Sequence, residues 1–146
     1  MAEEADRQFP LETGGVLTGY VRDGQYVVMQ VTGPGPAADH GSVRFEPDHE
    51  WQCRELDRIF AETAGVCSYL GDWHTHPRGE PNLSSLDRRT LAKIATSVEA
   101  RAPQPLMVIG AGEPGQWRWA AHACLGGRLG GLWPRFIECK PRIFRS

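Results

Sequence analysis

Two histidines, a serine and an aspartate stand close together in the middle of this chain. His74 and His76 follow an apolar run, and Ser84 and Asp87 come after a turn that contains proline and glycine. Side chains of a strand alternate between its two faces, so the two histidines can point to one side and share a metal ion. Asp87 can supply a third, anionic ligand once the chain has turned back. Two histidines and one carboxylate leave a coordination position open, as in a catalytic rather than a structural zinc site.

Hydrolysis at such a site also needs a group that accepts the proton of the attacking water. Glu12 is the candidate, because Gly14 and Gly15 allow close backbone approach and the strand after them can lie beside the histidine strand. Ser84 lies three residues before Asp87, which is about one helical turn. Its hydroxyl can therefore donate a hydrogen bond to a developing oxyanion from the same side as the ligand.

This set of residues resembles the JAMM motif of the MPN (JAB) metalloprotease family. The matching positions are Glu12 followed by Gly14 and Gly15, Leu17-Thr18-Gly19, His74-x-His76-Pro77 and Ser84-x-x-Asp87. The stretch from Gly71 to Pro77 is especially similar to the bacterial branch, and the resemblance runs from about residue 12 to about residue 124. It implies one zinc ion per chain, held by His74, His76 and Asp87. It also implies that Glu12 is the general base and that the hydroxyl of Ser84 stabilises the oxyanion.

The resemblance further implies a fold and an activity. The family fold is of the α/β (α+β) class, a single MPN/JAB-like, cytidine-deaminase-like domain with a curved mixed sheet flanked by helices. Family members are typically isopeptidases that cut after the C-terminal tail of ubiquitin or a ubiquitin-like protein. Bacterial single-domain members commonly stand beside ubiquitin-activating and ubiquitin-conjugating-like enzymes, including in antiphage operons. We therefore expect a ubiquitin-like protein or its conjugates as the partner, with the tail bound as an extra strand along a sheet edge.

Two other functions remain compatible with parts of the pattern. A non-catalytic MPN-type scaffold would share the fold, but the presence of Glu12, Ser84 and all three candidate ligands favours catalysis. A non-haem Fe(II) oxygenase also uses two histidines and one carboxylate. That alternative explains neither Glu12 nor Ser84.

The expected elements place the candidate residues near a strand end and a helix start. Strands are expected at 16–20 and 25–31, which form a hairpin, and at 42–45, 66–73, 106–109 and 116–124. Helices are expected from an N-cap at Asp48 to about Thr63, and from Ser84 or Ser85 to about Ala100. The strand at 66–73 then delivers both histidines at its C-terminal end. We expect one domain over residues 1–146, with a core at about 10–125 and an unassigned tail at 126–146.

Charge and composition narrow the class of partner. The chain has 16 Lys and Arg against 18 Asp and Glu, a net charge of −2, and it carries no long run of either sign. This balance argues against binding to nucleic acid or to an anionic membrane. No apolar stretch approaches the roughly 20 residues of a membrane span, and the N-terminus is acidic where a signal peptide is basic and then apolar. We therefore expect a cytoplasmic protein.

The remaining residues with reactive side chains carry no functional signal of their own. They are Cys53, Cys67, Cys124, Cys139, His40, His49 and His122. The cysteines form no Cys-x-x-Cys pair, and buried thiols in a reducing compartment are the better interpretation. Trp73 is expected to pack in the core, although its place beside His74 would also let it form a wall of the metal site.

Overall fold

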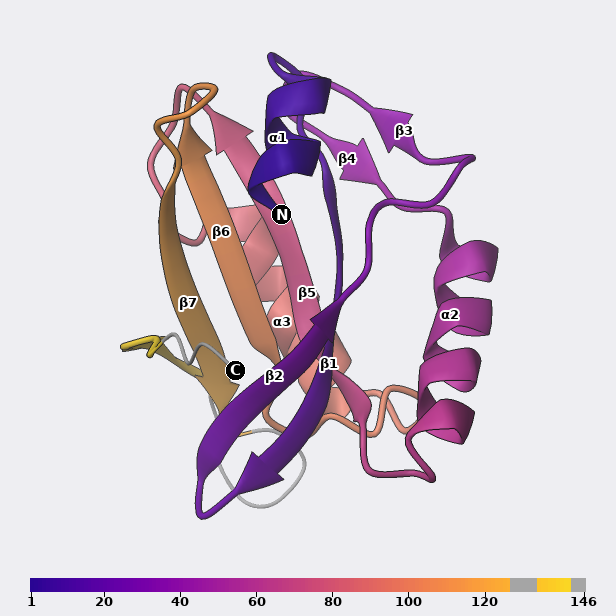
Figure 1. Cartoon of the computed structure of the whole chain (residues 1–146). Coiled ribbons are helices and arrows are strands. Elements are labelled where there is room, and N and C mark those ends of the chain that lie inside the picture. Colours follow the sequence, from indigo (N-terminus) through magenta and orange to yellow (C-terminus); the bar gives the residue numbers. More distant parts are fainter. Residues whose placement is uncertain (127–133, 143–146) are drawn as a thin grey trace.

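Six strands build one mixed sheet in the order β2-β1-β5-β6-β7-β8 in the computed structural model, which describes residues 1–126 and 134–142 (Figure 1). The strands are β1 Gly14–Arg22, β2 Gln25–Val31, β5 Ser68–Pro77, β6 Leu106–Gly112, β7 Arg118–Leu125 and β8 Arg135–Cys139. Neighbouring strands run antiparallel except β5 and β6, which are parallel. A parallel pair needs a crossover connection, and helix α3 (Ser85–Thr96) supplies it.

The first two strands form the expected hairpin. They are joined by Asp23 and Gly24, which have positive φ angles of 52° and 72°. Two positive φ angles give a turn whose twist matches that of the flanking strands. β1 begins at Gly14 instead of Val16, and Gly14 is the residue that pairs with His74 of β5.

Helices and a small second sheet surround the main sheet. α1 spans Ala2–Gln8, α2 spans His49–Glu62, and two short strands, β3 Asp39–His40 and β4 Phe45–Glu46, pair with each other. In Figure 1, α2 lies beside β1 and β5, whereas α1 and α3 lie on opposite sides of the sheet. Asp48 caps α2 as expected, because its side chain accepts from Trp51 N at 3.0 Å. Across the described residues, no helix is both long and apolar enough to cross a bilayer.

The core consists of two apolar clusters on the two faces of the sheet. The first contains Leu17, Leu70, Trp73, Leu106, Ala121 and Ala123, and the second contains Leu83, Leu91, Ala95, Met107, Ile109 and Cys124. Consecutive residues of β6 belong to different clusters, as expected from the two-residue period of a strand. Because Leu91 and Ala95 belong to α3, the second cluster lies under that helix. Trp73 packs in the first cluster and donates from Nε1 to Thr32 O at 2.8 Å, so it faces away from His74 and forms no wall of the metal site.

The two histidines lie within a strand instead of following it. β5 continues to Pro77, beyond the expected end at Trp73, because its pairing with β6 extends as far as Pro77. His74 is thus paired with β1 and β6, and His76 is paired with β6. The expected curved mixed sheet flanked by helices is confirmed.

Other element ends differ from the expectation. α3 ends at Thr96 instead of about Ala100, because Ser97 adopts an extended backbone with φ −71° and ψ 129°. The strand expected at 42–45 is reduced to β4, and α1 and β8 are not predicted by the sequence patterns. The part of the unassigned tail at 127–133 and 143–146, including Trp133, lies outside the described residues.

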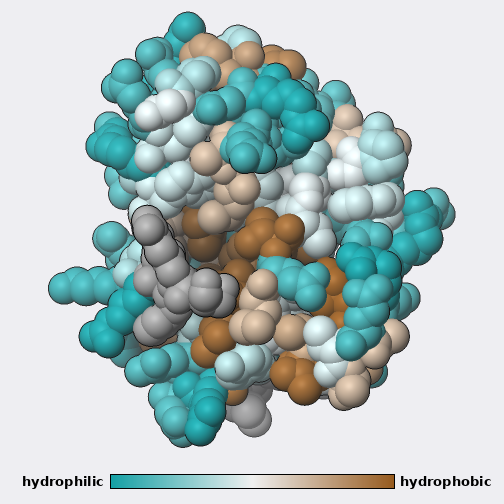
Figure 2. Space-filling view, viewed as in Figure 1, coloured by the Kyte–Doolittle hydropathy of each residue, from teal (hydrophilic) through white to brown (hydrophobic). Residues whose placement is uncertain are grey.

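The face seen in Figure 2 is largely hydrophilic, with an apolar area at its centre. Exposed apolar side chains on β1 and β2 include Val21, Val28, Met29 and Val31. As far as the described strands show, β2 has a neighbour on one side only, and its sequence contains no charged residue. An uncharged edge strand is a surface on which another extended chain can pair.

Candidate active site

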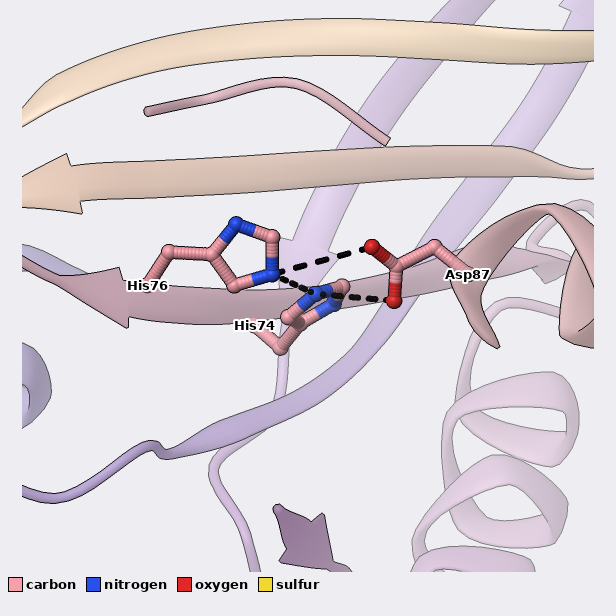
Figure 3. A group of neighbouring side chains, drawn as sticks. All are labelled: His74, His76 and Asp87. Atoms are coloured by element: carbon pink, nitrogen blue, oxygen red, sulfur yellow. Dashed lines mark hydrogen bonds and ion pairs between the residues drawn. The ribbon is translucent and has the colours of Figure 1, made fainter. Parts of the chain in front are cut away.

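His74, His76 and Asp87 bring three ligand atoms to one point (Figure 3). The two Nε2 atoms are 3.0 Å apart. The carboxylate of Asp87 lies 3.3 Å from Nε2 of His74 through Oδ1, and 3.6 Å from Nε2 of His76 through Oδ2. Ligands bound at 2.0–2.1 Å around a tetrahedral zinc ion are about 3.3 Å from one another. The spacing of these three side chains therefore fits a single metal ion.

The strand and the helix each fix part of this geometry. His74 and His76 are two residues apart in β5, so both side chains point to the face covered by α3. Asp87 lies in the first turn of α3, at the start of the crossover from β5 to β6. The three ligand side chains are largely buried, with exposed fractions of 13%, 19% and 10% respectively.

A hydrogen bond selects the tautomer of His76. Its Nδ1 lies 3.0 Å from the carbonyl oxygen of Glu80. A carbonyl oxygen only accepts, so Nδ1 carries the proton and Nε2 keeps its lone pair for a metal. Burial lowers the pKa of His76, which further favours the neutral ring that a metal requires.

Asp87 is at once a candidate ligand and part of a helix cap. Its backbone N–H donates to Ser84 Oγ at 3.2 Å, and its Oδ2 accepts from the backbone N–H of Ser84 at 2.7 Å. This capping box makes Ser84, not Ser85, the N-cap of α3. Burial acts to raise the pKa of Asp87, but hydrogen bonds from His74 and Ser84 hold that pKa well below its usual range. The carboxylate is therefore ionised at neutral pH.

Strand pairing carries Glu12 to the metal-ligand cluster. Gly14 pairs with His74 in the antiparallel β1–β5 ladder, and Thr75 N donates to Thr13 O at 2.8 Å just beyond it. Continuing that register places Glu12 opposite His76, and residues opposite each other share a face of the sheet. Burial and the nearby Asp87 raise the pKa of Glu12, while His74 lowers it. A raised pKa suits a carboxylate that takes up a proton and then releases it.

Family comparison gives an independent result. The family of prokaryotic homologs of the JAB domain matches residues 1–122 of the chain. The chain belongs to this family. A probable metalloprotease of Sinorhizobium fredii, y4qB, is 41% identical over 130 residues, which cover 86% of this chain and 77% of that protein. With these findings, the enzyme class predicted from the sequence, a hydrolase of the JAMM metallopeptidase type, is confirmed.

The chain is also similar to a protein with a named activity and to a solved structure. The CD-NTase/cGAS isopeptidase of Vibrio cholerae is 30% identical over 99 residues, covering 68% of this JAB domain chain but only 62% of that isopeptidase. The solution structure of protein DSY2949 from Desulfitobacterium hafniense is similar with a TM-score of 0.66 at 20% identity, covering 96% of this chain and 83% of the other. The second likeness shows the fold alone.

Two side chains that sequence reasoning passed over hold the Glu12 segment of the JAB domain. His40 Nδ1 lies 2.9 Å from Glu12 O and so donates to it, while Glu12 N donates to Gly41 O at 2.8 Å. On the other side, Thr75 Oγ1 accepts from Thr13 N at 3.0 Å. Thr75 stands between the two histidines, which could have drawn attention to it. No sequence signal marks His40, because its contact depends on where β3 lies.

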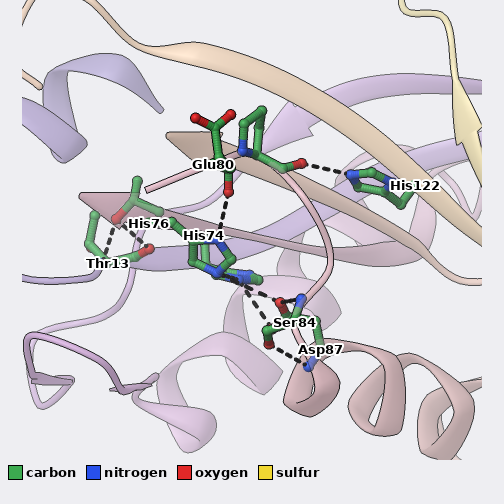
Figure 4. A network of polar contacts seen from close by, with 9 residues as sticks. Thr13, His74, His76, Glu80, Ser84, Asp87 and His122 are labelled. Atoms are coloured by element: carbon green, nitrogen blue, oxygen red, sulfur yellow. Dashed lines mark hydrogen bonds and ion pairs between the residues drawn. The ribbon is translucent and has the colours of Figure 1, made fainter. Parts of the chain in front are cut away.

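His122 is also more than an ordinary strand residue. It is 7% exposed, and its Nε2 lies 2.8 Å from Pro81 O in the loop between β5 and α3 (Figure 4). The sequence pattern assigns it to the less apolar face of its strand. That face is the one covered by α3, because His122 pairs with Met107 of the second core cluster.

Proposed function

We propose that this JAB domain is a zinc-dependent isopeptidase that hydrolyses the bond after the C-terminal tail of a ubiquitin-like modifier. The observation that carries the proposal is the convergence of the His74 and His76 Nε2 atoms and the Asp87 carboxylate within 4.8 Å. Strand register adds Glu12 to the same face, and the helix cap places Ser84 beside Asp87. The candidate ligands, base and hydrogen-bond donor come from β5, the start of α3 and the segment before β1, and this arrangement supports the proposal.

Zinc is the metal that the donor set suits best. Two imidazoles and one carboxylate match the ligands of catalytic zinc sites that keep one position open. When bound, zinc lowers the pKa of a water molecule from about 15.7 towards about 7 and polarises a neighbouring carbonyl. His74, His76 and Asp87 would hold it, and the Glu80 carbonyl would orient His76.

Glu12 and Ser84 supply the proton transfer and the charge stabilisation. Glu12 accepts the proton of the attacking water and passes it to the amine that leaves, so the carboxylate returns to its starting state. Ser84 Oγ accepts from Asp87 N, which leaves its own hydrogen free to donate. That donor is placed to bind the carbonyl oxygen of the substrate as negative charge develops on it.

The substrate class is inferred from the relatives. Proteins named CD-NTase/cGAS isopeptidase match 57–63% of their own length with this chain, in Vibrio cholerae, Escherichia coli, Enterobacter hormaechei and Pseudomonas aeruginosa. Their name supports a protein conjugate as the substrate here as well. We propose a ubiquitin-like protein joined to its target as that conjugate, with ubiquitin-activating and ubiquitin-conjugating-like enzymes as functional partners in a cytoplasmic antiphage system. A single catalytic domain over residues 1–146 is part of the same proposal.

Metal analysis and one cleavage assay test the proposal together. We expect about one zinc per purified wild-type chain, and loss of zinc in Asp87→Ala because a ligand is gone. A ubiquitin-like protein fused through its tail to a reporter should be cleaved by the wild type and not by Glu12→Gln. Zinc with no cleavage of any fusion or conjugate would favour a scaffold, and bound iron in its place would favour an oxygenase.

A further inference from the structure

The loop from residue 78 to residue 84 links all three candidate metal ligands. It leaves β5 directly after His76 and Pro77, and it ends at Ser84, the cap of the helix that carries Asp87. Within it, the carbonyl of Glu80 accepts the Nδ1 hydrogen bond of His76. The position of this loop therefore decides both the orientation of one ligand and the place where the helix of another begins.

A buried histidine from a distant strand holds the loop. His122 of β7 lies 41 residues from Pro81 in sequence, and its Nε2 is 2.8 Å from Pro81 O. Because a carbonyl oxygen only accepts, Nε2 must carry the proton and donate. At 7% exposure, the His122 ring is largely shielded from bulk water, so its Nε2–H would be costly to leave without an acceptor.

The chain between the two anchored carbonyls is stiff. Pro81 directly follows Glu80, and its ring fixes φ near −65°. The residue before a proline is restricted as well. Holding the carbonyl of Pro81 therefore limits the orientations open to the carbonyl of Glu80, which is the group that contacts His76.

A second polar contact between β7 and this loop is weaker. Arg118 NH2 pairs with Glu80 Oε1 at 3.1 Å, but the two side chains are 61% and 66% exposed. Exposed ion pairs of this kind contribute little in water. Of these two contacts, the His122 bond is the one able to fix the loop.

We propose that His122 is a positioning residue of the metal site: it anchors Pro81, so that the Glu80 carbonyl keeps His76 in the tautomer and orientation that bind metal. The proposal rests on the metal site of the proposed function, but not on the identity of the substrate. A histidine that merely fills the core would be replaceable by any side chain of similar volume. A positioning histidine is replaceable only by one that still donates to Pro81.

Two variants separate these roles through zinc affinity. His122→Gln keeps a donor near the position of Nε2, whereas His122→Leu removes it. Zinc dissociation constants are measured by competition with a chelator of known affinity, and urea unfolding of the zinc-free forms reports folding separately. We expect His122→Leu to bind zinc about 10- to 100-fold more weakly, the usual effect of losing a metal ligand's hydrogen-bond partner, because the Glu80 carbonyl would no longer be held against His76. His122→Gln and the loop control Arg118→Gln should stay close to wild type.

The outcomes distinguish the two proposals. Wild-type zinc affinity in His122→Leu, or an equal loss in folded His122→Gln, would overturn the positioning role. If His122→Leu does not fold, nitrogen-resolved NMR of the wild-type imidazoles decides, since a proton on Nδ1 of His122 instead of Nε2 contradicts the bond. Wild-type protein that binds zinc but cleaves no ubiquitin-like fusion would refute the isopeptidase and leave the role of His122 standing.

Discussion

Ser84 has two tasks that can be separated by two substitutions. Ser84→Ala and Ser84→Gly both remove the hydroxyl that we place at the oxyanion. Alanine is a poor N-cap and should lower the free energy of unfolding by about 1 kcal/mol, whereas glycine should lower it by only a few tenths. For a domain of this size, 1 kcal/mol corresponds to about 3–4 °C in Tm. The bond from the backbone N–H of Ser84 to the Asp87 carboxylate does not use the Ser84 side chain and survives in both variants, so zinc affinity should change little.

The two variants should therefore differ in stability but not in activity. Losing one oxyanion donor lowers kcat by about 10²–10³, and we expect this loss to be similar in both variants although their Tm values differ. The assay is steady-state cleavage of a ubiquitin-like reporter fusion by zinc-loaded protein, with thermal unfolding of the same samples. A glycine variant with wild-type kcat would refute the catalytic role of the hydroxyl. A kcat loss that is large in alanine and small in glycine would assign the effect to capping alone.

Three further outcomes follow from contacts around the site. Glu12→Gln should keep its zinc and lose about 10²–10⁴ in kcat, because the amide cannot take the proton of the attacking water; unchanged turnover would remove Glu12 from the mechanism. Thr75→Val deprives the buried N–H of Thr13 of its acceptor and should cost about 1–3 kcal/mol in urea unfolding, whereas Thr75→Ser should stay near wild type. Burial raises the pKa of Asp72 to about 6, above the ordinary value of about 3.9. The zinc-free protein should therefore lose stability as pH rises between these values, because the buried Asp72 carboxyl must give up its proton. Asp72→Asn should raise Tm near pH 7 and not near pH 3. An equal gain in Tm at both pH values would show that the ionisation of Asp72 is not the cause.

The metal ligands could be predicted from the sequence because they depend on local regularities. The two-residue period of a strand puts His74 and His76 on one face, and the spacing from Ser84 to Asp87 is that of a capped first helical turn. The hairpin at Asp23 could be predicted equally well, since the residues that favour its turn lie within the turn itself. Patterns of this kind need no knowledge of what packs against them.

The supporting contacts could not be predicted in the same way. His40 reaches Glu12, and His122 reaches Pro81, across 28 and 41 residues of sequence. Each contact exists only after separate elements have packed together. β8 pairs with β7 but lies in a tail without a clear alternating pattern, so long-range pairing, not its own sequence, forms it.

The parallel pairing of β5 with β6 gives the motif spacing a physical meaning. Seven residues lie between His76 and Ser84, and they span the step from the end of a strand to the start of the crossover helix. The length of this loop sets the distance between the ligands. One residue more or less would move the helix start, and with it Asp87, relative to the two imidazoles, which stay fixed in the strand. The lengths of the Asp23–Gly24 turn and of the connection from α3 to β6 do not set the distances between the ligands, because neither connection directly joins two residues of the site. An insertion in either of those connections should therefore leave the distances between the ligands unchanged, whereas an insertion in the short loop after His76 should change them.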